Sequence, residues 1–130
     1  MLHLQIAPSS GVPSYRQIMD QIAYYVASGS LRPGDALPSI RELAGRLAVN
    51  PSTIVKAYGE LEHQGVVEMR QGKGVFVAGG GRKLPAAELK RALRAEARRL
   101  ALGAKQMGLS RELARELLDE EMDRLEKGGS

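Results

Sequence analysis

Apolar side chains recur every three or four residues along the first half of the chain, which is the period of a helix that buries one of its sides. The first such run covers residues 13–28 and stops at Gly29, the second covers residues 40–47, and the third starts at Pro51 and stops at Gly65. Glycine commonly follows a helix because it adopts a left-handed backbone without strain. The pattern therefore predicts three consecutive helices.

The second and third helices carry their own start signals. Ser39, with Glu42 three positions later, forms a capping box, and Asn50 followed by Pro51 is typical of the first residues of a helix. Only residues 48–50 separate the two helices. A connection this short makes the helices cross steeply, so the start of the later helix projects from the domain, where it can enter a DNA major groove.

Two short apolar-rich runs, residues 66–69 and 75–77, flank a polar segment that contains two glycines. This arrangement is typical of a β-hairpin, and it places the charges of Arg70 and Lys73 at the tip. Residues 31–38 contain two prolines and a Pro-Gly pair, so we expect a loop there. Three helices followed by a hairpin form the layout of a winged helix-turn-helix, and we predict a mainly α fold with a small β-wing.

The last third of the chain reads as a separate segment. Three consecutive glycines and two cations at residues 79–83 predict a flexible linker. Two amphipathic helices are expected beyond it, at residues 85–102 and 110–125, joined by GAKQMGLS. Residues 84–108 carry a net charge of +4, and residues 109–130 carry a net charge of −3.

These two helices enclose little apolar surface by themselves, so their leucine-bearing sides need a partner. A second copy of the chain is the most economical partner, and we predict a homodimer. The alternative is that the helical hairpin folds back on its own winged domain and the chain stays monomeric.

The segments LPSIRELA, VNPSTIVKAYGELE and RQGKGVFV resemble the DNA-binding half of the GntR family of bacterial transcription regulators. The resemblance covers residues 12–78, and the remainder is similar to the short two-helix tail of the YtrA subfamily. Ala48 departs from the glycine that many such turns carry, and a left-handed backbone there costs about 1–2 kcal/mol.

The resemblance implies a domain organisation and a function. It implies a winged helix-turn-helix DNA-binding domain at residues 11–79, a Gly-rich linker at 80–84, and a two-helix C-terminal dimerisation region at 85–127. The function it implies is that of a sequence-specific transcription regulator that binds double-stranded DNA. We expect a dimeric repressor on an inverted-repeat operator, controlling a transporter operon. A protein-binding winged helix with an acidic partner is the alternative.

The residues expected to contact DNA follow from the direction of their side chains and from the resemblance. The start of the later helix of the pair meets base edges and phosphates, and Ile54, Ala57 and Leu61 face inward. Arg41 matches a position at which GntR proteins commonly contact DNA. The complete DNA-binding set is Ser39, Arg41, Asn50, Ser52, Thr53, Lys56, Gln71, Gly72 and Lys73.

Several of these residues have a purely structural alternative. Ser39, Asn50 and Ser52 are ordinary helix-capping residues, and Arg41 can pair with a nearby glutamate instead of DNA. Tyr58 is expected to pack against the wing, with its hydroxyl as a further candidate for a phosphate contact.

Composition and the absence of other motifs narrow the classes of function that remain for this chain. The chain has 130 residues, no cysteine, a net charge of +4 and a pI near 9.6, which favours an anionic partner. It has neither an export signal nor a long apolar run, so we expect a cytoplasmic protein without a membrane segment. No activated nucleophile, phosphate loop or ligand cluster is recognisable, so we expect no enzyme activity, no cofactor and no metal. A small-molecule effector stays unknown; the tail alone is too short to enclose a typical pocket of about 300–1,000 Å³.

Overall fold

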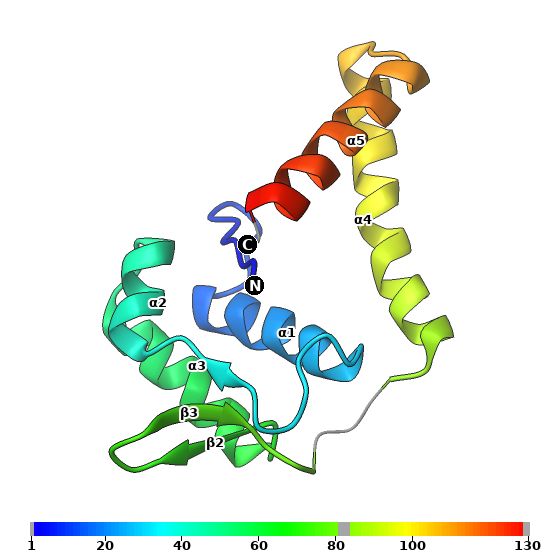
Figure 1. Cartoon of the computed structure of the whole chain (residues 1–130). Coiled ribbons are helices and arrows are strands. Elements are labelled where there is room, and N and C mark those ends of the chain that lie inside the picture. The colour runs from blue at the N-terminus through cyan, green and yellow to red at the C-terminus, as the bar shows by residue number, and fades with distance from the viewer. Residues whose placement is uncertain (1, 81–83, 129–130) are drawn as a thin grey trace. The chain divides into compact units, whose positions relative to one another are not determined.

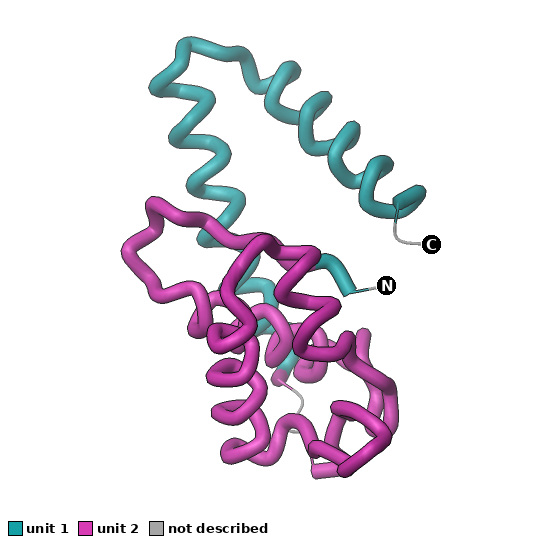
Figure 2. The backbone as a smooth tube through the Cα atoms, turned by 90° about the vertical axis from the view of Figure 1, so that its left-hand side faces the viewer, with its two compact units in different colours: residues 1–3, 85–130 teal, residues 4–84 magenta. Residues whose placement is uncertain are grey.

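The computed structural model describes residues 2–80 and 84–128. The chain divides into two compact units, shown in Figure 2. We call Leu4–Leu84 the winged unit, and Met1–His3 together with Pro85–Ser130 the tail unit. Residues 81–83 of the predicted linker lie outside the described residues.

Within the described residues, five helices and three short strands follow one another (Figure 1). A mainly α fold with a small β-sheet is therefore confirmed. In order, the elements are α1 (Ser14–Ala27), β1 (Ala36–Leu37), α2 (Ile40–Leu47), α3 (Pro51–His63), β2 (Val67–Arg70), β3 (Gly74–Val77), α4 (Ala86–Met107) and α5 (Arg111–Gly128).

Helix α3 is the centre of the winged unit, because α1, α2 and β2 all contact it. The predicted inward residues Ile54, Ala57 and Leu61 are completely buried, and so is Tyr58. The neighbouring elements contribute the other large buried side chains, namely Ile18, Ile22, Leu43, Val67 and Val77. A helix fixed on three sides in this way holds its remaining side rigidly toward solvent.

The loop expected at residues 31–38 contains a strand, so that prediction is wrong in part. Ala36 and Leu37 form β1, which pairs antiparallel with Phe76 and Val75 of β3. The amide of Val77 donates to the carbonyl of Asp35 (2.9 Å), which continues the ladder. A strand of two residues is too short to show an alternating pattern in the sequence. The sheet has the order β1-β3-β2.

The strands β2 and β3 extend closer to the hairpin tip than the sequence predicted, so the turn is shorter. Arg70 pairs with Gly74 in the antiparallel ladder, which leaves only Gln71, Gly72 and Lys73 in the turn. Gly72 has φ +76°. The amide of Lys73 closes the turn by donating to the carbonyl of Arg70 (2.9 Å).

Helix α4 also extends beyond its predicted end at residue 102. It continues through Gly103 to Met107 and stops at Gly108, which has φ +70° and caps the helix. The connection to α5 is therefore shorter than GAKQMGLS. Interior glycine costs a helix only about 1 kcal/mol, and the good helix formers after Gly103 outweigh it.

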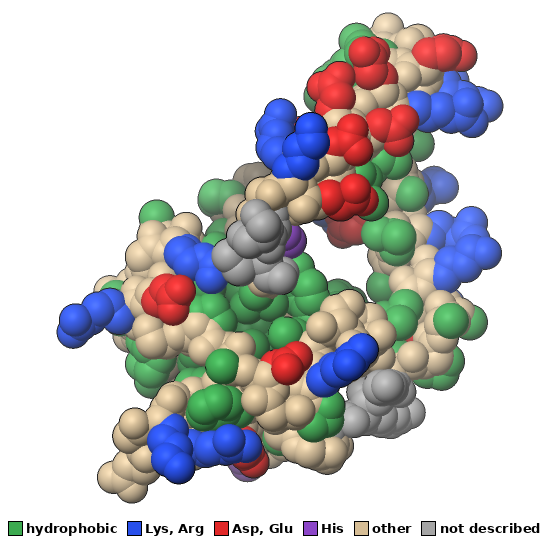
Figure 3. Space-filling view, in the orientation of Figure 1, with side chains coloured by type: hydrophobic (Ala, Val, Ile, Leu, Met, Phe, Trp, Pro, Cys, Tyr) green, Lys and Arg blue, Asp and Glu red, His purple; other side chains and the backbone are tan. Residues whose placement is uncertain are grey.

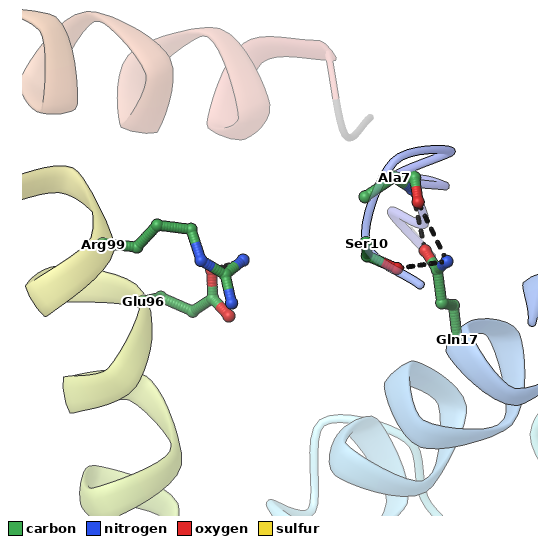
Figure 4. A network of polar contacts seen from close by, with 5 residues as sticks. All are labelled: Ala7, Ser10, Gln17, Glu96 and Arg99. Carbon is green, nitrogen blue, oxygen red and sulfur yellow. Dashed lines mark hydrogen bonds and ion pairs between the residues drawn. The ribbon is translucent and has the colours of Figure 1, made fainter. Parts of the chain in front are cut away.

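The N-terminal segment lies against α1, which the sequence had not indicated. Gln17 accepts from the amide of Ala7 (2.7 Å) and donates to its carbonyl (3.0 Å) and to the hydroxyl of Ser10 (3.0 Å), as Figure 4 shows. One turn later, Gln21 makes the same pair of bonds with the backbone of Gln5 (3.0 and 2.7 Å). The two side-chain carboxamides thus supply the hydrogen bonds that the backbone of this segment would otherwise need from a neighbouring strand.

Candidate nucleic-acid interface

The turn between α2 and α3 has the tight geometry that its sequence predicted. Ala48 lies in the left-handed region, with φ 54° and ψ 46°, and is the one non-glycine residue with positive φ among those described. The amide of Val49 donates to the carbonyl of Ala44 (3.0 Å), so the end of α2 is hydrogen-bonded as in a Schellman motif. Three residues, 48–50, separate the end of α2 from the start of α3.

Both helices have side-chain caps at their starts. The hydroxyl of Ser39 accepts from the amide of Glu42 (3.0 Å), and the side-chain oxygen of Asn50 accepts from the amide of Ser52 (3.0 Å). The structural roles expected for these residues are therefore present. Their roles in DNA contact stay predictions.

Tyr58 fixes the position of α2 relative to α3. Its hydroxyl donates to the carbonyl of Pro38 (2.7 Å), just before α2 begins, and its side chain is completely buried. The suggestion that this hydroxyl meets a phosphate is wrong, because it is enclosed and already bonded. Burial raises the pKa of Tyr58 well above its ordinary value, and the negative charge of Glu42 adds to that effect.

The outer side of α3 presents the candidate reading surface. Ser52 and Lys56 are exposed there, while Thr53 is half-buried. The hydroxyl of Ser52 donates to Asn50 (3.0 Å), so it must exchange that bond to donate to a phosphate. Among the described residues the Thr53 hydroxyl has no hydrogen-bond partner, so it is ready to donate. Phosphate oxygens only accept, which makes a donor of this kind suitable.

Lys56 is directed toward α1 rather than straight outward. Its ammonium lies 4.2 Å from the centre of the Tyr15 ring, a cation–π contact. A DNA contact by Lys56 therefore needs a change of side-chain rotamer.

Val55 is a candidate that the sequence reasoning missed. Its side chain is 51% exposed on α3, next to the buried Ile54. An exposed β-branched residue on this helix can contact the methyl group of thymine in the major groove. The signal was present in the sequence, because position 55 falls outside the spacing of Ile54, Ala57 and Leu61.

Gly59 leaves the same helix without a side chain at another exposed position. Gly59 is exposed, and a Cβ atom placed there would meet nothing within 4 Å. The absence of a side chain lets another backbone approach the helix closely.

Two exposed cations flank α3, on α2 and on the wing. Within the described part of the chain, neither the guanidinium of Arg41 nor the ammonium of Lys73 has an ion-pair or hydrogen-bond partner. The alternative in which Arg41 pairs with a glutamate is therefore not observed. Unpaired cations retain their full charge for an anionic partner.

The wing carries a third cation that is partly neutralised. Arg70 contacts the carboxylate of Glu68 at 2.6 Å and stacks on the ring of Phe76, with 4.3 Å between the guanidinium carbon and the ring centre. Gln71, Gly72 and Lys73 form the exposed tip beyond it. The tip thus has one free positive charge and one shared with a carboxylate.

The described residues were also compared with the requirements of a metal site and of a membrane-spanning helix. In residues 2–80 and 84–128 no group of three or more His, Asp or Glu side chains is placed to hold a metal ion. In the same residues no helix is both long and apolar enough to span a bilayer.

Comparison with known proteins gives consistent matches. The family model described as "Bacterial regulatory proteins, gntR family" matches residues 14–77. The HTH-type transcriptional repressor YtrA of Bacillus subtilis (strain 168) is 44% identical over 75 residues, which cover 58% of this chain and 58% of that protein. This chain therefore spans little more than half the length of that curated relative.

Two solved structures extend the comparison. YtrA from Sulfolobus acidocaldarius, described as a GntR-family transcription factor, is 39% identical with a TM-score of 0.52, over 71% of this chain and 93% of that chain. The DNA-binding domain of AraR in complex with operator ORX1 is 34% identical with a TM-score of 0.53, over 58% of this chain and 98% of that chain.

Proposed function

This chain belongs to the gntR family of bacterial regulatory proteins, and we propose that it is a sequence-specific DNA-binding repressor of transcription. The family consists of regulators rather than enzymes. The observation that carries the proposal is the outer side of α3, which is rigidly supported from behind and flanked by the unpaired cations of Arg41 and Lys73. AraR, whose DNA-binding domain has a similar structure, was solved with an operator.

In the proposed complex, the outer side of α3 lies in the major groove. The α3 contacts come from Asn50, Ser52, Thr53 and Lys56, with Val55 directed at a thymine methyl group. Ser39 and Arg41 contribute from the start of α2. Gln71, Gly72 and Lys73 of the wing contact the phosphate backbone or the minor groove.

The tail unit is proposed to form a homodimer. Neither α4 nor α5 contains a buried residue, and apolar side chains such as Leu93 (70% exposed) and Met107 (74% exposed) face solvent in the single chain. Amphipathic helices with uncovered leucines gain stability when a second copy covers them. On this proposal, residues 11–79 bind DNA, residues 80–84 link, and residues 85–127 dimerise.

A dimer places two copies of α3 in successive major grooves, about 34–36 Å apart, on an inverted repeat. Repression follows when that operator overlaps a promoter. YtrA of Bacillus subtilis is described as a transcriptional repressor, which supports repression as the mode of action. Control of a transporter operon is proposed on the resemblance to the YtrA subfamily alone.

Selection of genomic fragments by the purified protein, followed by sequencing, tests this function. We expect an inverted repeat to be enriched. Affinity for it should fall by about 10³–10⁵ between 50 and 200 mM salt if six to ten phosphates are contacted. Fragments without a shared motif would contradict sequence-specific binding.

Substitutions then test the site. Arg41→Ala and Thr53→Ala should each lose operator binding while the protein remains folded. Arg16→Ala is a suitable control, because Arg16 is an exposed cation on α1 that pairs with Asp20 (3.6 Å) outside the proposed contact set. Wild-type affinity in both test variants would refute the assignment. Light scattering that gives the mass of one 14.1 kDa chain would separately refute the dimer.

A further inference from the structure

The wing is packed against the rest of the winged unit at its base but not at its tip. Val67, Val75 and Val77 are buried, whereas every residue from Arg70 to Gly74 is exposed. The tip projects from the winged unit in Figure 1, and Lys and Arg side chains gather over the wing at the lower left of Figure 3. Apolar packing therefore ends before the tip that is proposed to contact DNA.

A side-chain hydrogen bond joins α3 to the wing where this packing ends. The amide of Met69 donates to the carboxylate of Glu62 (3.1 Å), which lies in the last turn of α3. Met69 is 39% exposed and comes directly before the exposed tip. β2 is an edge strand, so the amides along its outer edge have no neighbouring strand to bond. Glu62 supplies the acceptor that one of them needs.

A bond at this point acts on the tip more than on the base. The end of a two-stranded hairpin without packing partners moves readily, because few contacts oppose its motion. A hydrogen bond to a carboxylate is stronger than one between neutral groups. With Met69 held to α3, the turn that carries Lys73 keeps one direction relative to the helix proposed to enter the major groove. Less ordering is then required when DNA binds.

We infer that Glu62 is a positioning residue of the DNA interface, because it holds the wing through the amide of Met69 so that Lys73 reaches the DNA backbone while α3 lies in the groove. The inference rests on the proposed function and adds to it a residue outside the expected contact set. The carboxylate of Glu62 would repel a phosphate. Its role therefore lies in the bond that it accepts and not in a DNA contact of its own.

The sign of the effect on affinity distinguishes positioning from charge. A carboxylate that acts by its charge alone weakens DNA binding, so every neutral substitution should strengthen it. A positioning carboxylate behaves in the opposite way when its bond is lost. Glu60 is the matched control, since it is exposed on the same helix and its carboxylate accepts no hydrogen bond within the described part of the chain.

Four variants of the full-length chain test the inference by fluorescence anisotropy with the selected operator. Glu62→Gln keeps an oxygen that can accept from the Met69 amide and removes the charge, so it should bind at least as tightly as wild type. Glu62→Ala lacks the acceptor and should bind about three- to tenfold more weakly than Glu62→Gln at 50 mM salt. Glu62→Asp retains the charge on a shorter side chain and should share this loss. Glu60→Ala should bind no more weakly than wild type.

A double-mutant cycle with Lys73 separates positioning from a loss of stability. In the Lys73→Ala background the contact that Glu62 serves is already absent, so Glu62→Ala and Glu62→Gln should differ there by less than about twofold. A defect in folding would weaken binding equally in both backgrounds. The slope of log affinity against log salt should also fall in Glu62→Ala, by up to about 1, as expected for Lys73→Ala.

Two results would overturn the inference. Equal affinity of Glu62→Ala and Glu62→Gln would show that the bond to Met69 does not serve DNA binding. An equal loss with and without the Lys73 side chain would leave Glu62 with a role in stability only. A wild-type protein that selects no DNA motif would instead refute the proposed function on which the inference depends.

Discussion

The hydroxyl of Tyr58 donates a 2.7 Å hydrogen bond to the carbonyl of Pro38, and so α3 is joined to the segment that leads into α2. Twenty residues separate the two groups in the sequence. The bond lies inside the winged unit, where the Tyr58 side chain is completely buried. It therefore holds the two helices of the helix-turn-helix at a fixed distance without touching the outer side of α3.

Tyr58→Phe should destabilise the winged unit by about 1 kcal/mol, because the carbonyl of Pro38 loses its buried donor while the ring still packs. Chemical denaturation monitored by circular dichroism measures the change. Tyr24→Phe is the control, since the Tyr24 side chain is 47% exposed and should tolerate the change. Equal stability of the two variants would show that the bond to Pro38 contributes nothing.

The same tyrosine should make stability depend on alkaline pH. Burial raises the pKa of Tyr58 in the folded state, so only the unfolded chain ionises at pH near 10. The stabilisation is fully present below the unfolded value and falls by up to about 1.4 kcal/mol per pH unit above it. Tyr58→Phe lacks this loss.

The stability curves of wild type and Tyr58→Phe should therefore cross near pH 11, about one unit above the ordinary tyrosine value. Urea titrations at a series of pH values compare the two, and the other ionisable groups cancel in the difference. Parallel curves between pH 9 and 12 would contradict a raised pKa for Tyr58.

The sequence was sufficient for the elements that depend on local signals. The caps at Ser39 and Asn50 set the starts of α2 and α3, and each acts over two or three residues. β1 could not be found in this way, because it exists only through its pairing with Phe76 and Val75, far along the chain. The partners of Tyr58 and Gln17 depend on tertiary packing for the same reason.

For the candidate site, the sequence indicated which segments contribute residues, but not which contacts each side chain makes within the fold. Helical spacing placed Ser52 and Thr53 near the start of α3. It could not show that Lys56 lies over the Tyr15 ring or that Glu68 neutralises Arg70, since both depend on neighbours across the fold. Helical spacing gave Val55 no role, because it is an apolar residue outside the buried positions and it carries no polar group.

Ala48→Gly should stabilise the winged unit by about 1 kcal/mol. Ala48 has φ 54°, and a left-handed backbone is costly for any residue with a Cβ atom but not for glycine. Ala48→Val should have the opposite effect, because a β-branched side chain tolerates this conformation least. Thermal unfolding measures both variants, and a melting temperature for Ala48→Gly below that of wild type would contradict the assigned strain.

Lys73→Ala and Val55→Ala should separate the contribution of charge to DNA affinity from the contribution of base recognition. Removing Lys73 should weaken binding to operator and to unrelated DNA about equally and lower the slope of log affinity against log salt by about 1. Removing the Val55 side chain should weaken operator binding alone and leave the slope unchanged. Fluorescence anisotropy at several salt concentrations gives both quantities. The assignments would have to be exchanged if the slope changed in the Val55 variant only.

Glu68→Gln should strengthen DNA binding at low salt. Glu68 holds Arg70 in an ion pair, and its carboxylate repels any phosphate near the wing. The neutral amide keeps the size of the side chain, while Arg70 remains placed by its contact with the Phe76 ring (4.3 Å). One more available cation should raise affinity severalfold at 50 mM salt, and the gain should shrink at 200 mM because the contact releases counterions. Glu60→Gln, which removes an exposed carboxylate from α3 instead of the wing, measures how much of the gain any lost negative charge produces. An equal gain in both variants would mean that general charge, rather than the release of Arg70, sets the affinity.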